Sequence, residues 1–266
     1  MNAKTHNVKN SNATSVRVST TRVASGNVNL HVVMYGDSKK TPVVLVHGYP
    51  DNNQVWKPVA ELLAKKYFVI AYDVRGAGQS DVPSRVNDYR MELLARDLAA
   101  VVDAVIPGRR FHMAAHDWGS IQSWESVTTD RLKPRIASFT SISGPSLDHA
   151  SHWIRERTFN LSPLAKAKVM KQLLSSWYIG FFQLPVLPKA TWEAGFGKLW
   201  PSYLAKREGV AEHEPNPTQT EDGKHGVQLY RANFRNKLIN PEERHAICPV
   251  QLLVPEDVVV KNVNLA

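Results

Sequence analysis

The stretch Phe111-His-Met-Ala-Ala-His-Asp-Trp-Gly-Ser120 decides the interpretation of this chain. Its first half is typical of a buried strand, and a helix is expected to open at Gly119. Two small residues, Ala115 and Gly119, stand two positions on either side of Asp117. A strand that turns straight into a helix has no room for larger side chains there, so the central residue is pushed out above the strand end. The segment predicts a carboxylate displayed at a helix N-terminus, where free N–H groups stabilise negative charge.

An aspartate at such a turn can be a nucleophile or a simple helix cap. A carboxylate is ionised at neutral pH, so it needs no base before it attacks carbon. Attack would expel a leaving group and leave an alkyl ester on Asp117. A histidine with a supporting acid would then activate water to hydrolyse that ester. Helix caps of this kind are common, so the turn alone leaves both interpretations open.

The rest of the sequence alternates strands with helices. Sequence patterns predict a hairpin over 16–35 and buried strands at 42–46, 67–72, 111–115, 136–142 and 249–254. Apolar residues at helical spacing predict helices over 55–63 and 94–105, the second ended by Pro107-Gly108. Such alternation implies right-handed crossovers. We therefore expect an α/β fold with a mostly parallel twisted sheet and helices on both faces.

Residues 146–245 interrupt this alternation with an aromatic-rich insert. It holds four of the seven tryptophans, namely Trp153, Trp177, Trp192 and Trp200. Its ends must lie close together because it joins two core strands, so we expect an inserted lid and not a second independent domain. The lid should be mainly helical, at least over 161–177. The predicted division is a disordered polar tail at 1–20, a core at 21–145, the lid at 146–245 and the remaining core at 246–266.

Two further motifs follow predicted strands. His47-Gly48-Tyr49-Pro50 comes after the strand at 42–46, and Asp73-Val-Arg-Gly-Ala-Gly-Gln-Ser80 after the strand at 67–72. The backbone N–H groups of Tyr49 and Trp118 would form an oxyanion hole for the acyl oxygen of the ester. We interpret Asp73 and Arg75 as structural. Three motifs in order, each at the carboxyl end of a strand, favour the nucleophile over the cap.

HGYP, DVRGAGQS and HDWGS in this order resemble the epoxide hydrolase and haloalkane dehalogenase branch of the α/β-hydrolase superfamily. The resemblance covers residues from about 22 to 257. It is closest to the hydrolase half of bacterial proteins in which such a domain is followed by a short-chain dehydrogenase. It implies the α/β-hydrolase fold with Asp117 as nucleophile, substrate contacts for His47 and Trp118, and no cofactor or metal.

The lid should decide between an epoxide and a halide. The resemblance assigns Tyr178, in WYIGFFQ, and Tyr230, in QLYR, as the acids that protonate the opening epoxide oxygen. The alternative is that both tyrosines only pack, as aromatics usually do. A dehalogenase would hold its halide with N–H donors. Trp118 could be one, but Tyr49 occupies the other place. We therefore expect epoxide hydrolysis to a diol, with a dehalogenase or a non-catalytic ligand-binding scaffold as alternatives.

The resemblance assigns the supporting acid to Asp257 and puts the histidine after one further strand. Only nine residues follow Asp257 in this sequence. Among the chain's own histidines, His149 and His152 follow a strand at the correct end of the sheet, with Asp148 as an alternative acid. We expect none of them to substitute well. The hypothesis is a truncated chain that is alkylated at Asp117 but deacylates slowly, and whose sheet has an open edge.

Composition limits the compartment and the partners. The single Cys248 excludes an internal disulfide and suits a reducing cytoplasm. No apolar run approaches the length of a membrane span, and the N-terminus lacks a secretory signal. The formal charge is +9, and the densest basic stretch, 155–171, sets five basic residues against Glu156. A patch for anionic lipid or nucleic acid is one interpretation, but a solvated surface is favoured. We predict a cytoplasmic protein that takes a small apolar epoxide and binds no nucleic acid. The sequence does not determine the oligomeric state.

Overall fold

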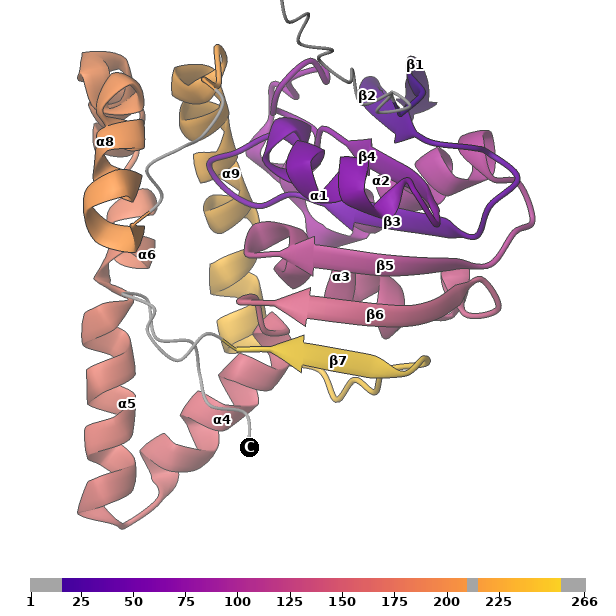
Figure 1. The fold of residues 1–266 in the computed structure, drawn as a ribbon. Coiled ribbons are helices and arrows are strands. Elements are labelled where there is room, and N and C mark those ends of the chain that lie inside the picture. Colours follow the sequence, from indigo (N-terminus) through magenta and orange to yellow (C-terminus); the bar gives the residue numbers. More distant parts are fainter. Residues whose placement is uncertain (1–15, 210–214, 255–266) are drawn as a thin grey trace, which may run out of the picture.

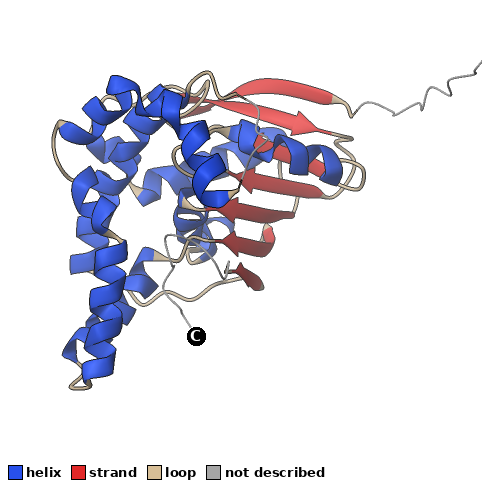
Figure 2. Ribbon diagram, turned by 60° about the vertical axis from the view of Figure 1, so that its left-hand side comes forward, coloured by secondary structure: helices blue, strands red, loops and turns tan. Residues whose placement is uncertain are grey.

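The computed structural model describes residues 16–209 and 215–254 (Figures 1 and 2). Most of the expected tail at 1–20 lies outside these ranges, and so does Asp257. Strand β1 already begins at Val18, so the predicted boundary at residue 20 is too late. The strand starts there because the residues from Val18 pair in register with β2, which ends at Tyr35.

The described residues contain a seven-stranded sheet in the order β1-β2-β4-β3-β5-β6-β7. The strands β1 and β2 form the expected antiparallel hairpin, and β2 also pairs antiparallel with β4. All pairings from β4 across to β7 are parallel. The predicted, mostly parallel sheet is confirmed. The strand bounds are β1 Val18–Ser25, β2 Val28–Tyr35, β3 Pro42–Val46, β4 Phe68–Tyr72, β5 Phe111–His116, β6 Ile136–Ile142 and β7 Val250–Leu253.

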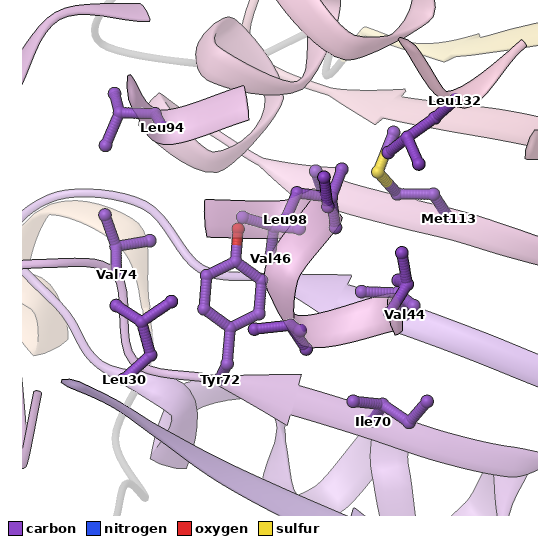
Figure 3. Packing of buried hydrophobic residues seen from close by; sticks show 14 of the residues in the cluster. Leu30, Val44, Val46, Ile70, Tyr72, Val74, Leu94, Leu98, Met113 and Leu132 are labelled. Carbon is purple, nitrogen blue, oxygen red and sulfur yellow. The ribbon is translucent and has the colours of Figure 1, made fainter. Parts of the chain in front are cut away.

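Alternating side chains of the central strands pack into two separate apolar clusters. In β3, Val44 and Val46 belong to the cluster with α2 and α3, which Figure 3 shows from close by. Val43 and Leu45 belong to the cluster with α1 on the other face. Burial on both faces explains the continuous apolar runs, since each fully buried aliphatic side chain contributes about 1.5–3 kcal/mol. The helices of this core are η1 Asn53–Trp56, α1 Lys57–Leu63, η2 Val86–Tyr89, α2 Met91–Val105, α3 Trp118–Val127 and η3 Asp130–Leu132.

Helix α1 forms where it was predicted, but a different face of the helix contacts the sheet. Of the four apolar residues whose spacing predicted it, Val55, Val59 and Leu62 are exposed, with Leu62 at 65%, whereas Leu63 is partly buried against the cluster with β4. The buried side chains are Ala60 and, just after the helix, Ala64, which pack in the same cluster. Small side chains let this short helix approach the sheet closely, so most of the apolar stripe faces solvent.

The insert between β6 and β7 is helical, as predicted. Helix α9 runs along the carboxyl end of the sheet and is tied to the core by Asn233, which accepts from the backbone N–H of Met91 at 2.9 Å and donates to the carbonyl of Tyr89 at 2.9 Å. Figure 1 shows α5, α6 and α8 on the side away from the sheet. The helices are α4 Leu147–Phe159, α5 Pro163–Ser175, α6 Trp177–Phe182, α7 Leu187–Thr191, the π-turn η4 Trp192–Phe196, α8 Gly197–Glu208 and α9 Gln219–Ile239.

No helix within 16–209 or 215–254 combines the length and apolar character that crossing a bilayer requires.

Candidate active site

Asp117 stands at the turn between β5 and α3 with backbone angles φ 52° and ψ −124°. A non-glycine residue with positive φ is strained, at a cost on the order of 1–3 kcal/mol, and persists only where its surroundings enforce it. Here they do. A Cβ on Gly119 would lie 2.3 Å from the carbonyl oxygen of Val46, and one on Gly144 would lie 2.3 Å from the carbonyl oxygen of Asp117. The small residue that the sequence predicts at position 119 is therefore a steric requirement, and Gly144 is a second one that the sequence analysis did not identify. Helix α3 begins at Trp118, one residue before the predicted start.

The carboxylate of Asp117 meets two backbone N–H groups. The N–H of Tyr49 donates to Oδ1 at 2.8 Å, and the N–H of Trp118 lies close enough to this carboxylate to lower its pKa. Burial raises the pKa of Asp117, while the positive charge of His116 and these two N–H groups act against the rise. The two donors named as the oxyanion hole therefore converge on the side chain that would carry the ester.

The two lid tyrosines come to the same place from different helices. Tyr178 lies on α6 and Tyr230 on α9, and their ring centroids are 6.1 Å apart. The Tyr230 ring is 4.8 Å from that of Trp118. Burial raises the pKa of both phenols, and the negative charge of Asp117 raises each further. Both hydroxyls therefore remain protonated at neutral pH beside the carboxylate.

Further aromatic rings surround Tyr230, and sequence reasoning gave them no role. Phe182 is 4.6 Å away between centroids, and Phe234 is stacked on it at 5.6 Å. The ring of Tyr49 is 5.4 Å away. The Tyr49 hydroxyl donates to the carbonyl of Gly223 at 3.0 Å and accepts from the indole N–H of Trp192 at 2.8 Å. Tyr49 thereby joins the core loop to the insert.

The indole N–H of Trp118 is buried and has no properly aligned acceptor among the described residues. It lies close enough to the Tyr230 phenol to influence its pKa, which burial dominates. A buried donor without a partner costs roughly 1–3 kcal/mol. It is therefore a group that a ligand could satisfy.

Known proteins match this chain in sequence and in its mostly parallel seven-stranded fold. The model of the family described as alpha/beta hydrolase fold matches residues 41–235. The chain belongs to this family. It is 33% identical over 245 residues to the "Probable oxidoreductase EphD" of Mycobacterium tuberculosis. This match covers 85% of this chain and 39% of that protein. It is 30% identical over 168 residues to epoxide hydrolase 3 of Xenopus tropicalis, which covers 63% of this chain and 42% of that protein.

Solved structures share the fold of this alpha/beta hydrolase. An epoxide hydrolase of Bacillus megaterium in complex with an inhibitor superposes with a TM-score of 0.69 at 20% identity, covering 87% of this chain and 81% of that one. An epoxide hydrolase of Vigna radiata gives 0.64 at 19% identity, covering 91% and 81%. Curated relatives with the name epoxide hydrolase match part of this chain, and the chain spans only about two fifths of the length of the curated relatives it matches at 30% identity or more.

Other predicted residues hold the loops of this hydrolase. His47 accepts from the N–H of Val74 at Nε2, 2.9 Å, and its Nδ1 is 2.9 Å from the carbonyl of Gly48. It lines a small pocket with Tyr49 and Trp118, but both its ring nitrogens are engaged, so a substrate contact through them would require a rearrangement. Asp73 accepts from the N–H of Gln79 in its own loop and from the backbone and side-chain N–H groups of Asn53 at the start of η1. Arg75 forms a buried two-fold pair with Asp97 at 2.6 Å. Both are placed as structural residues, as interpreted.

Two buried carboxyl groups near Asp117 escaped sequence reasoning. Burial first, and then the negative charges of Asp117 and Asp222, raise the pKa of Asp51 to about 7. Burial also raises the pKa of Asp222, whose carboxylate accepts from the N–H of Gly78 at 2.7 Å. Asp51 and Asp222 line the same small pocket as Tyr49. They are 171 positions apart in the chain. Only the tertiary fold brings them together, so no local pattern could have revealed the pair.

The alternative histidines are occupied elsewhere. His149 lies with Nε2 at 2.8 Å from the carbonyl of Arg244, and His152 with Nε2 at 3.2 Å from that of Glu242. Asp148, the alternative acid, is buried in an ion pair with Lys237 at 3.1 Å. These residues hold the start of the insert against the segment before β7. Within the described ranges, no group of three or more His, Cys, Asp or Glu side chains is arranged to hold a metal ion.

Proposed function

We propose that this alpha/beta hydrolase opens an epoxide by attack of Asp117. One carboxylate oxygen forms a bond to an epoxide carbon while the bond from that carbon to the epoxide oxygen breaks. The oxygen leaves as an alkoxide and takes a proton from Tyr178 or Tyr230, because an alkoxide is far more basic than a phenol. The product is a hydroxyalkyl ester on Asp117, and its hydrolysis gives a vicinal diol.

One observation carries the proposal: a buried carboxylate shares its site with two protonated phenols. Tyr49, whose N–H donates to Asp117 at 2.8 Å, has its ring 5.4 Å from that of Tyr230, and the Tyr178 ring lies 6.1 Å from that of Tyr230. The names of the curated relatives support an epoxide substrate. The N–H groups of Tyr49 and Trp118 would hold the acyl oxygen when water attacks the ester.

Release of the diol requires a base to activate water. Of the histidines in the described ranges, His47 has both nitrogens engaged. His116 adjoins Asp117, and we expect it to point away from the ester. The others have polar partners elsewhere or lie exposed, namely His31, His112, His149, His152, His225 and His245. Asp257, the expected acid, lies outside the described residues. We therefore propose that the 266-residue chain, tested alone, forms the ester faster than it releases the diol.

Mass spectrometry of the chain incubated with styrene oxide tests both steps. We expect a persistent adduct of one styrene oxide that peptide mapping assigns to Asp117. The Asp117→Asn variant should stay folded and carry no adduct, because an amide is a poor nucleophile. An adduct on another residue would contradict the assignment of the nucleophile. Steady diol formation without an adduct would contradict slow release.

A haloalkane substrate is the second candidate, and the unpaired indole N–H of Trp118 favours it, because N–H donors can hold a departing halide. Release of one chloride per chain from a chloroalkane, absent in Asp117→Asn, would identify this activity. If neither substrate modifies Asp117 but an apolar ligand still binds, the chain is a non-catalytic scaffold.

A further inference from the structure

The densest basic stretch of the sequence lies on an outlying part of the insert. We name residues 155–177 the basic arm: the end of α4, the following loop, α5 and the start of α6. Large apolar side chains on the arm are exposed, with Phe159 at 80%, Leu161 at 91%, Leu174 at 68% and Trp177 at 68%. Figures 1 and 2 show α4 and α5 projecting as a hairpin beyond the rest of the insert. Nothing among the described residues covers these side chains.

The exposed face of α5 combines apolar and basic residues in a regular order. Val169 is the one fully buried side chain described on this helix. Met170 and Leu174 are four positions apart, so they share one face, and both are exposed. Lys166 precedes Met170 by four positions, and Lys171 precedes Leu174 by three. Exposed lysines therefore lie in line with the apolar strip (Lys166) and beside it (Lys171), so the surface of α5 offers apolar and positively charged side chains together, as a membrane interface requires.

Charge identifies the kind of surface that would cover this face. The arm carries five basic side chains and one acidic one, Glu156, which is paired with Arg157 at 3.4 Å. On the same side of the molecule, α8 adds the exposed Lys198 and Lys206. A second copy docking through the same face would bring like charges together. A surface with negatively charged groups over an apolar interior would match both the basic side chains and the exposed apolar side chains of the arm.

We propose that the basic arm binds the surface of an anionic lipid bilayer. Leu174, Met170 and Trp177 enter the headgroup region, and the lysines lie against the anionic headgroups. Trp177 precedes Tyr178, whose ring lies 6.1 Å from that of Tyr230. Helix α6 therefore begins at the basic arm and carries Tyr178 of the candidate active site. The binding itself does not depend on the proposed function.

Flotation with vesicles tests this inference on the 266-residue chain. One set contains phosphatidylcholine with one third phosphatidylglycerol, and the other contains phosphatidylcholine alone. We expect binding to the anionic set at low salt, at least about tenfold weaker binding to the neutral set, and weakening in high salt.

Matched variants assign the binding to the arm. The charge reversal Lys168→Glu with Lys171→Glu should weaken binding at least about tenfold, whereas Lys65→Glu with Lys66→Glu, exposed on the core, should have little effect. The change Leu174→Ser should also weaken binding, whereas Leu62→Ser, at a similarly exposed position, should not. Equal losses in both charge pairs would overturn the proposal. The proposal would also be overturned if the chain did not bind vesicles and light scattering showed a dimer. It would be overturned as well if the chain bound nucleic acid instead of vesicles.

Discussion

The two halves of the candidate site are held by different forces. On the core side, the chain segments around Asp117 are in direct contact. A Cβ at Gly119 or Gly144 would collide with backbone oxygens, and a Cβ at Gly48 would collide with the side chain of Asp117. On the insert side, Tyr178 and Tyr230 are positioned by ring contacts between α6 and α9. Backbone contacts fix a position within tenths of an ångström, whereas ring contacts permit rotation and small shifts. We therefore expect Asp117, the proposed nucleophile, to be held more rigidly than the two tyrosines, the proposed proton donors.

A few hydrogen bonds connect these halves across long sequence separations. Tyr49 donates to the carbonyl of Gly223 at 3.0 Å, and Gln219 donates to the carbonyl of Pro50 at 2.7 Å. Gly226 has no side chain because a Cβ there would lie 2.4 Å from the Tyr49 ring. The loop after β3 thus carries both an oxyanion donor and the attachment point of the insert. The insert cannot shift far without disturbing the N–H of Tyr49.

The largest effect should come from the core half. Gly119→Ala would force a methyl group against the backbone oxygens of Val46 and His47, so we expect a loss of about 3 kcal/mol or more in the free energy of unfolding. Gly180→Ala is the matched control, because its Cβ would meet nothing within 4 Å on the exposed side of α6. Urea denaturation measures both. Equal stabilities for the two variants would show that the turn is not under steric constraint.

A smaller effect should come from the insert half. Tyr178→Phe and Tyr230→Phe keep the rings and remove the acids, so each should slow alkylation of Asp117 by styrene oxide about tenfold to a hundredfold, and the double variant more. The melting temperature should change little. Tyr203→Phe, on α8, is the control and should react like the parent chain. If all three variants react equally, the phenols are packing residues only.

The rate of Asp117 alkylation should also depend on the ionisation of the Asp117 carboxyl group. Burial raises the pKa of Asp117, and the carboxylate is the reactive form. The rate of alkylation should therefore keep rising at pH values where an ordinary aspartate is already ionised. It should level off only once Asp117 has lost its proton. The initial rate of adduct formation, measured across pH, tests this. A rate that is flat from pH 5 upward would contradict a raised pKa.

The effect that is smallest within any single pH unit concerns Asp51, which lines the same pocket as Asp222 at the meeting of the two halves. The folded state holds the Asp51 proton up to about pH 7, whereas the unfolded chain releases it near its ordinary pKa of 3.8. The folded state binds more protons in this window, so the free energy of unfolding should fall as pH rises, by about 1 kcal/mol per pH unit. Asp51→Asn should flatten the fall, and Asp117→Asn should lower the pKa of Asp51 by removing a negative neighbour. Parallel stability curves for the parent chain and Asp51→Asn would contradict this.

Local patterns in the sequence were sufficient for most of the core. The apolar runs of β3 and β4 and the small residues around Asp117 act over a few positions, so their effect can be inferred without coordinates. Of the apolar stripe Val55, Val59, Leu62 and Leu63, only Leu63 packs against the core cluster, because periodicity predicts a helix but does not say which side faces the sheet. The close approach of Ala60 decided that side.

The sequence by itself determined the α/β architecture, the displayed Asp117 and the helical nature of the insert, because strand and turn propensities are set by neighbouring residues. The tertiary structure decided that Tyr49, Trp192 and Gly223 lock the insert to the core, that Asp51 and Asp222 share a pocket, and that His149 and Asp148 serve the insert's base. It also decided that the basic arm is an exposed, partly apolar face. These features depend on contacts between residues far apart in the chain, and such contacts follow from how whole elements pack.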